Sequence, residues 1–318
     1  MADGALLAGF DAGQTHTTCR LSEVSTGATL AEGQGPGVCH LEGPDGPERF
    51  RHALRQSLQQ ALGRRAPSRL IAAGIGASGV EVGAPVQAQA RQLAAEALGL
   101  APARVVVTGD ERTALRGAMG SGLAGIVVIS GTGMIAVGRN AAGEEHRCGG
   151  WGWLLDGAGS AMDIGRDGLA LSLEMADGRR SDSPLRARIW AGLNLDPNDP
   201  EAPQAIKARV VAADFGPAGF ARLAPLVAAA AAAGDPAAAV VVERSAQALA
   251  RMVATISQQL ALVAPPVWPM GGALDHLEAL RQGFVAAMQL NCPGAQLLPP
   301  AGDACSGALT LARLCLEP

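Results

Sequence analysis

Two short turns rich in glycine and threonine carry the most suggestive chemistry in this chain. Asp11–Thr17 reads Asp-Ala-Gly-Gln-Thr-His-Thr, Ser130–Gly133 reads Ser-Gly-Thr-Gly, and each stands at the end of an apolar run. Glycine lets a backbone come close to a ligand, and consecutive N–H groups in such a turn bind anions. An aspartate at a strand end suits Mg2+, usually through water. Such turns also join ordinary hairpins, but together the two predict a phosphate site with Asp11 as the magnesium contact.

Lysine is nearly absent from the chain, which excludes several classes of phosphate enzyme. Lys207 is the only lysine, and it lies in an expected helix far from any glycine-rich loop. A P-loop nucleotidase needs a lysine in its glycine-rich loop, a protein kinase needs one on a strand, and a Schiff-base enzyme needs one as nucleophile. Phosphates must therefore be held by backbone N–H groups, hydroxyls and a metal ion.

The composition indicates a folded, mildly acidic protein. Of 318 residues, 48% are hydrophobic and 17% charged, and the net charge of -4 offers no surface for nucleic acid. No apolar run reaches the roughly 18 residues that cross a bilayer, and no basic segment of a signal peptide opens the chain. The six cysteines are scattered, without a disulfide framework or zinc spacing. We expect a cytoplasmic protein with neither a membrane nor a nucleic-acid partner.

The expected secondary structure alternates strands with helices in two similar halves. The first half has strands at 6–11, 17–21, 29–32, 70–74 and 104–108 and helices at 48–62, 85–98 and 110–119. The second has strands at 125–130, 134–138 and 267–270, mostly helices from 160 to 263, and helices at 273–289 and 306–316. Each half opens with a strand, a Gly/Thr turn and a second strand. This pattern predicts a duplicated architecture of α/β layers with mixed sheets.

Asp110 follows a strand and begins a helix, so two roles are open for it. Aspartate is a good helix N-cap, worth about 0.5–2 kcal/mol to the helix. Transfer of a phosphoryl group, in turn, needs a carboxylate that takes the proton of the acceptor hydroxyl. The spacing alone does not choose between these roles.

Five motifs, in order, resemble the N-acetylglucosamine kinase branch of the BadF/BadG/BcrA/BcrD ATPase family, within the sugar kinase/heat-shock-70/actin superfamily. They are Asp11–Thr17, Asp110, Ile129–Gly133, Cys148–Gly152 and Gly271-Gly272. The resemblance covers nearly the whole chain and implies an α/β fold of two actin-like, ribonuclease H-like lobes with an ATP cleft between them. Residues 1–118 and 306–318 would form one lobe, and residues 119–305, with helical insertions, the other. The implied activity is ATP-dependent phosphorylation of an amino-sugar hydroxyl, in a protein that the family suggests is a homodimer.

The resemblance also implies roles residue by residue. Asp110 would be the catalytic base, and Asp11 would hold Mg2+ through water. The residues that would bind ATP are Asp11, Gly13, Gln14, Thr15, Gly131, Thr132, Gly133, Gly271, Gly272 and His276. Those that would bind the amino sugar are Cys39, His40, Ser78, Gly79, Asp110, Met134, Gly150, Trp151, Gly152 and Asp156.

The departures from the family pattern lie mostly on the acceptor side. Cys39 replaces an asparagine, and Met134 replaces a small polar residue. Gly157 and Ala158 align with an Asp-Glu pair, although Asp156 lies one residue earlier. A pocket that recognises hydroxyls loses orders of magnitude in affinity when its polar partners are removed. The acceptor is therefore open among N-acetylglucosamine, glucosamine, N-acetylmuramic acid and other polyols, and an ATP-binding relative without kinase activity is an alternative.

Other classes of protein fit less well. Gly74–Gly79 spells G-x-G-x-x-G, as in dinucleotide-binding oxidoreductases, but there a helix begins at once, whereas residues 80–85 intervene here. An ATP-driven activator of a radical dehydratase needs closely spaced cysteines for an iron–sulfur cluster. An actin-like polymer would leave the tryptophan-bearing loop without a purpose.

Overall fold

The computed structural model describes residues 4–66 and 69–316, which divide into two compact units. Within the described residues, unit 1 comprises 4–123 and 299–316, and unit 2 comprises 124–298. The boundaries inferred from the sequence lay after residue 118 and before residue 306. Residues 1–3, 67, 68, 317 and 318, which were included in that division, lie outside the described residues.

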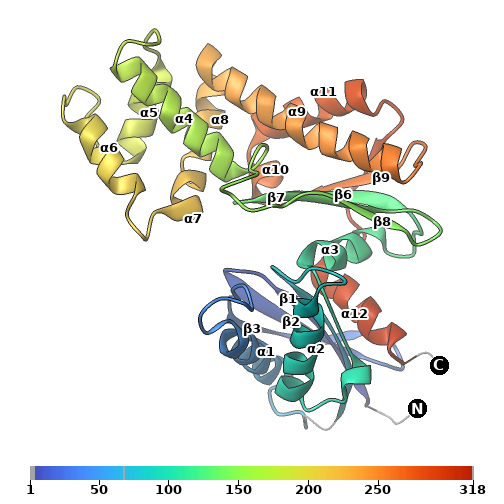
Figure 1. The fold of residues 1–318 in the computed structure, drawn as a ribbon. Coiled ribbons are helices and arrows are strands. Elements are labelled where there is room, and N and C mark those ends of the chain that lie inside the picture. Colours follow the sequence, from blue (N-terminus) through green and yellow to red (C-terminus); the bar gives the residue numbers. More distant parts are fainter. Residues whose placement is uncertain (1–3, 67–68, 317–318) are drawn as a thin grey trace. The chain divides into compact units, whose positions relative to one another are not determined.

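Unit 1 is a five-stranded mixed sheet covered by helices on both faces (Figure 1). Its strands are β1 (Leu6–Ala12), β2 (His16–Glu23), β3 (Thr29–Pro36), β4 (Leu70–Ala77) and β5 (Val105–Thr108), in the order β3-β2-β1-β4-β5. Strands β1, β4 and β5 are parallel, and the β1–β2–β3 hairpins are antiparallel. The helices are α1 (Gly46–Leu62), α2 (Pro85–Leu98), the short η2 (Pro102–Arg104), α3 (Asp110–Met119) and α12 (Ala304–Leu314). Helices α1 and α2 pack together on one face, and α3 and α12 on the other.

The last helix, α12, lies directly on the central strands of unit 1. A Cβ atom on Gly9 of β1 would stand 2.5 Å from the carbonyl oxygen of Cys305, and one on Gly74 of β4 would stand 2.0 Å from that of Ala308. Only glycine at these two positions permits so close a contact between helix and sheet. The packing of the last helix on the N-terminal unit is therefore confirmed.

Asp303 ties α12 to the sheet and caps the helix. Its carboxylate accepts two hydrogen bonds of 2.6 Å from the Arg20 guanidinium and one of 2.9 Å from the Ser306 backbone N–H. Partial burial works to raise the pKa of Asp303, but the hydrogen bonds from Arg20 and Ser306 outweigh it and hold that pKa below its usual value.

We expect Asp303→Ala to destabilise the protein. The loss should be about 1 kcal/mol of unfolding free energy at neutral pH, because a cap and a half-exposed ion pair disappear together. Since the folded pKa is lowered, this stabilisation is present above the unfolded pKa of about 3.9 and is lost as pH falls through the folded pKa. Urea titrations from pH 7 to pH 3 measure it, with the exposed Asp214→Ala as control. A gap between wild type and variant that does not narrow in acid would contradict the account.

Unit 2 repeats the strand topology of unit 1. Its strands are β6 (Gly125–Ser130), β7 (Met134–Arg139), β8 (Glu145–Gly149), β9 (Pro266–Met270) and β10 (Gln296–Leu297), in the order β10-β9-β6-β7-β8. Read from β6, this is the order and direction of β1 to β5, so the expected duplication is confirmed. The antiparallel β8 and the two-residue β10 did not stand out in the sequence.

A large helical layer accompanies the sheet of unit 2. It consists of α4 (Ala161–Ala176), α5 (Pro184–Gly192), α6 (Ala202–Val210), α7 (Gly216–Ala221), α8 (Ala224–Ala232), α9 (Pro236–Gln259), α10 (Gly272–His276) and α11 (Glu278–Asn291). In the described part of the chain no single helix is long and apolar enough to cross a membrane. The helical segments Gly216–Ala232 and Pro236–Gln259 together have the length and composition of a span, but they form a pair bent by 115°.

Two expectations about helix ends are wrong. Asp110 is not an N-cap, because Gly109 occupies that position and Asp110 is the first residue of α3. The helix expected at 273–289 is two helices, α10 and α11, because Leu277 is buried with an extended backbone (φ -96°, ψ 86°) and interrupts the hydrogen-bond ladder. Asp110 nevertheless lies in the first turn, where its carboxylate accepts a hydrogen bond of 3.0 Å from the Glu111 N–H.

Candidate functional site

The first Gly/Thr turn joins β1 to β2 and presents open hydrogen-bond donors. The Gly13 N–H donates to the His16 carbonyl at 3.1 Å and closes the turn. Among the residues that the structure describes, no acceptor lies within hydrogen-bond distance of the N–H groups of Gln14 and Thr15. Two consecutive free N–H groups at the end of a hairpin suit an anion such as a phosphate.

Two carboxylates stand at the same edge of the unit 1 sheet. Asp11 lies near the end of β1 and Asp110 just beyond β5, and both strands run parallel to β4 between them. Burial raises the pKa of Asp110, and the charge on Asp11 raises it further, so the two carboxylates are close enough to repel each other. Burial likewise raises the pKa of Asp11, against the effect of His16. Asp110 is thus prepared to accept a proton.

The surroundings of Asp11 fit a magnesium ion that is bound together with phosphates. No group of three histidine, cysteine or acidic side chains gathers at metal-ligating distance anywhere in residues 4–66 and 69–316. Mg2+ commonly keeps several waters and uses only one or two carboxylates plus substrate phosphates. A half-buried Asp11 beside open phosphate donors matches that donor set, and a cation there would relieve the repulsion from Asp110 and Asp303.

The acceptor residues assigned to unit 1 gather around the same turn. The Ser78 N–H donates to the Ala12 carbonyl at 3.0 Å, and the Gln14 amide reaches the Ser78 hydroxyl at 3.4 Å. Gly79 has a positive φ of 81°, and a Cβ there would stand 2.6 Å from Nδ1 of His40. Cys39, which is half-buried, precedes His40. Asp11, Gln14, His40, Ser78 and Gly79 therefore form one neighbourhood in unit 1.

The second Gly/Thr turn joins β6 to β7 and rests on the start of α4. The carbonyls of Gly131 and Thr132 accept hydrogen bonds from the Ala161 and Met162 N–H groups at 2.9 and 3.3 Å. The N–H groups of Thr132 and Gly133 meet no acceptor in the described residues, and a Cβ on Gly131 or Gly133 would meet no atom within 4 Å. This turn also offers open donors, with open space in front of its backbone.

Gly271 and Gly272 lie beside the second turn. Gly271 follows β9, has a φ of 96°, and would place a Cβ 2.6 Å from the Ser130 carbonyl. Gly272 is exposed and begins α10, which ends at the exposed His276. The ATP residues assigned to unit 2 are therefore neighbours at one edge of its sheet.

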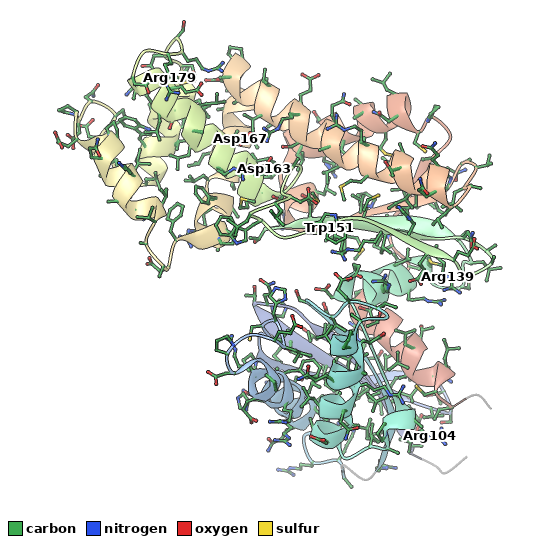
Figure 2. The ribbon with its side chains drawn as sticks, viewed as in Figure 1. Arg104, Arg139, Trp151, Asp163, Asp167 and Arg179 are labelled. Atoms are coloured by element: carbon green, nitrogen blue, oxygen red, sulfur yellow. The ribbon has the colours of Figure 1, made fainter. Side chains whose placement is uncertain are left out.

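A tryptophan-bearing loop follows β8 (Figure 2). Trp151 is 64% exposed, and the Arg147 guanidinium covers one face of its ring at 4.7 Å from the centroid. Arg147 also donates to the Gly150 carbonyl at 2.7 Å, so one side chain holds both the ring and the backbone before it. Glycines 149, 150 and 152 all have positive φ and shape the loop. A fixed, exposed aromatic face of this kind stacks well on a sugar ring.

Met134 and Asp156, the remaining acceptor candidates of unit 2, are less exposed than Trp151. Met134 is only 7% exposed and belongs to the hydrophobic core of unit 2, against Gly149. This placement favours a packing role for its side chain. Asp156 is half-buried, and its N–H donates to the Gly152 carbonyl at 2.8 Å, which folds the end of the loop back on its start.

An ionic cluster behind the second turn was not anticipated. Asp163, which is buried, forms ion pairs with Arg166 and with Arg244 of α9, and Arg244 also pairs with Asp167; Figure 2 shows both aspartates on α4. Burial and the charge of Asp163 raise the pKa of Asp167, and the arginines oppose this. The cluster holds α4 against α9, and so supports the turn. The sequence feature that could have indicated part of this cluster is Ser160-x-x-Asp163, which is typical of a helix start. In the structure the Ser160 hydroxyl accepts a hydrogen bond from the Asp163 N–H at 3.1 Å.

Comparisons with known proteins show the family. The model of the BadF/BadG/BcrA/BcrD ATPase family matches residues 8–312. The N-acetylmuramic acid/N-acetylglucosamine kinase of Clostridium acetobutylicum is 28% identical over 212 residues, which are 66% of this chain and 67% of that protein.

Solved structures give the same result. A Chromobacterium violaceum protein, provisionally described as an N-acetylglucosamine kinase, has a TM-score of 0.73 and 32% identity over 97% of this chain and 99% of its own. A ROK family glucokinase from Streptomyces griseus, solved with glucose and AMPPNP, has a TM-score of 0.59 at 16% identity, over 99% of this chain and 100% of its own, and is alike in fold.

Proposed function

Because the chain belongs to the BadF/BadG/BcrA/BcrD ATPase family and has the actin-like α/β fold of sugar kinases, we propose that it transfers the γ-phosphoryl group of ATP to a hydroxyl of an amino sugar. The observation that carries this proposal is the pair of Gly/Thr turns, each with two backbone N–H groups that have no acceptor among the described residues. In unit 1 such a turn stands beside the carboxylates Asp11 and Asp110. Donors for phosphate and a poised base are what phosphoryl transfer requires of a protein.

The proposed mechanism assigns one task to each group. The N–H groups of Gln14, Thr15, Thr132 and Gly133 orient the phosphates of ATP by hydrogen bonding. Asp11 would hold Mg2+, whose charge would offset that of the phosphates. The hydroxyl oxygen of the acceptor attacks the γ-phosphorus, and Asp110 accepts the hydroxyl proton. The bond between the γ-phosphorus and the bridging oxygen breaks, and ADP leaves.

On the acceptor side, we propose that the exposed face of Trp151 stacks on the sugar ring while Arg147 holds the opposite face. His40, Ser78 and Gly79, which neighbour the first turn, complete the acceptor contacts. The ATP cleft between the units, a homodimer and a cytoplasmic location stay predictions.

An ATP-binding relative without kinase activity is the second candidate. The observation in its favour is the loss of polar groups: Met134 is buried in the core, and Gly157 and Ala158 bear no hydrogen-bonding side chain where the family pattern has Asp-Glu. A site short of such groups recognises hydroxyls weakly.

An acceptor screen separates the two candidates. ADP release is measured with the pure protein and Mg-ATP across N-acetylglucosamine, glucosamine, N-acetylmuramic acid, N-acetylmannosamine and glucose. We expect ADP release that depends on an amino sugar, with a phosphorylated sugar in the product. If the protein bound ATP but released no ADP with any of these sugars, the kinase proposal would be wrong and the second candidate would remain.

A further inference from the structure

A basic recess opens in unit 1 beside the first turn. It has a volume of about 460 Å³ and is lined by Pro36, Gly37, Arg49, His52 and Gln56. Small-molecule sites commonly measure about 300–1,000 Å³. None of these residues has a role in the proposed phosphoryl transfer, so the recess is distinct from the site described above.

Three of the lining residues come from one face of α1 and are hydrogen-bond donors. Arg49, His52 and Gln56 follow helical spacing, and all three are exposed. Arg51, on the same helix, forms an ion pair with Glu48 at 2.7 Å, but no carboxylate within the described residues pairs with Arg49. Arg49 is therefore an available guanidinium, and its planar fork suits a carboxylate or a phosphate.

The other wall of the recess is the end of β3, which backs onto the first turn. The Pro36 carbonyl accepts from the Thr17 hydroxyl at 2.9 Å, and a Cβ on Gly37 would stand 2.0 Å from the Gln14 carbonyl. Three residues after Gly37 comes His40, which touches Gly79. Residues 36–40 therefore link a wall of the recess to a residue proposed to contact the acceptor.

We propose that this recess is a subsite for a carboxylate carried by the acceptor, so that the enzyme accepts acidic amino sugars. The inference rests on the proposed kinase function. Arg49 supplies the charge-assisted pair of hydrogen bonds, and His52 and Gln56 supply further donors. An acceptor-borne anion fits better than an ATP phosphate, because the open N–H groups for phosphate belong to the turn, whereas the recess lies behind the turn, on the Gln14 carbonyl side.

The test compares two sugars that differ only by a carboxylate-bearing ether, N-acetylmuramic acid and N-acetylglucosamine. In Arg49→Ala, KM for N-acetylmuramic acid should rise about tenfold, as expected for loss of a hydrogen bond to a charged group. Neither kcat nor KM for N-acetylglucosamine should change, because that sugar places nothing in the recess. Arg49→Lys should restore part of the affinity, since it keeps the charge but not the fork.

Arg55→Ala is the matched control, because Arg55 is exposed on the same helix but does not line the recess. It should leave both sugars unaffected, and melting curves should show all three variants folded. The inference fails if wild type phosphorylates N-acetylglucosamine but not N-acetylmuramic acid, or if Arg49→Ala weakens both sugars alike. Absence of phosphorylation with either sugar would instead overturn the kinase function, and the subsite with it.

Discussion

Asp110→Asn should lower turnover by orders of magnitude while leaving ATP binding intact. Loss of a positioned general base typically costs about 100- to 10,000-fold in rate, and we expect a fall of that size in kcat. The amide keeps the shape of the side chain and its hydrogen bond from the Glu111 N–H, which measures 3.0 Å in the wild type, but it cannot accept a proton from the acceptor. The measurements are steady-state kcat with the best acceptor and the Kd of Mg-ATP by calorimetry.

The same variant should not be less stable than wild type. Burial, with the charge on Asp11, raises the pKa of Asp110 above its ordinary value. The ionised carboxylate therefore costs the folded state stability above that pKa, and the cost fades as pH falls through it. At pH 7 the Tm of Asp110→Asn without ligand should equal or exceed that of wild type, and in acid the two should converge. Asp11→Asn is the contrasting variant, because it should weaken the dependence on Mg2+ instead. A kcat for Asp110→Asn within about tenfold of wild type would remove Asp110 as the base.

The fold followed from the sequence because its signals are local and repeated. Two Gly/Thr turns, each with an apolar run of strand length before it and a second strand after it, marked β1, β2, β6 and β7. The recurrence of this pattern indicated the duplication that the sheets display. Strands with weaker patterns were missed. Glu145–Gly149 is charged and half-buried, and Gln296–Leu297 has only two residues, so neither carries an apolar alternation.

The site could be predicted only where a residue's role depends on its own backbone. The turns at Gly13 and Gly131 are of this kind. Side-chain contacts were not visible in the sequence. The stacking of Arg147 on Trp151 depends on the path of the chain after β8, and the ion pair of Arg244 with Asp163 joins residues that are 81 positions apart. Met134 is a different case. The resemblance placed it among the acceptor contacts, whereas the structure buries its side chain in the core of unit 2.

Gly133→Ala should separate the ligand role of the second turn from its structural role. A methyl group there meets no protein atom within 4 Å, and Gly133 does not have a positive φ, so the fold should tolerate the change with little loss of Tm. The methyl group would instead occupy the space in front of the Thr132 and Gly133 N–H groups. Because hydrogen bonds to a charged phosphate would then be lost or lengthened, the Kd of Mg-ATP should rise about 10- to 100-fold.

Gly271→Ala is the informative partner of that experiment. Gly271 has φ 96° and ψ 150°, a conformation that costs other residues about 1–3 kcal/mol, and its Cβ would collide with the Ser130 carbonyl. This variant should therefore lose Tm and ATP affinity together, whereas Gly133→Ala loses affinity alone. Calorimetric titration with Mg-ATP and thermal melts of both variants measure the contrast. If Gly133→Ala bound ATP as wild type does, the second turn would be an ordinary hairpin, and phosphate recognition would have to lie elsewhere in the chain.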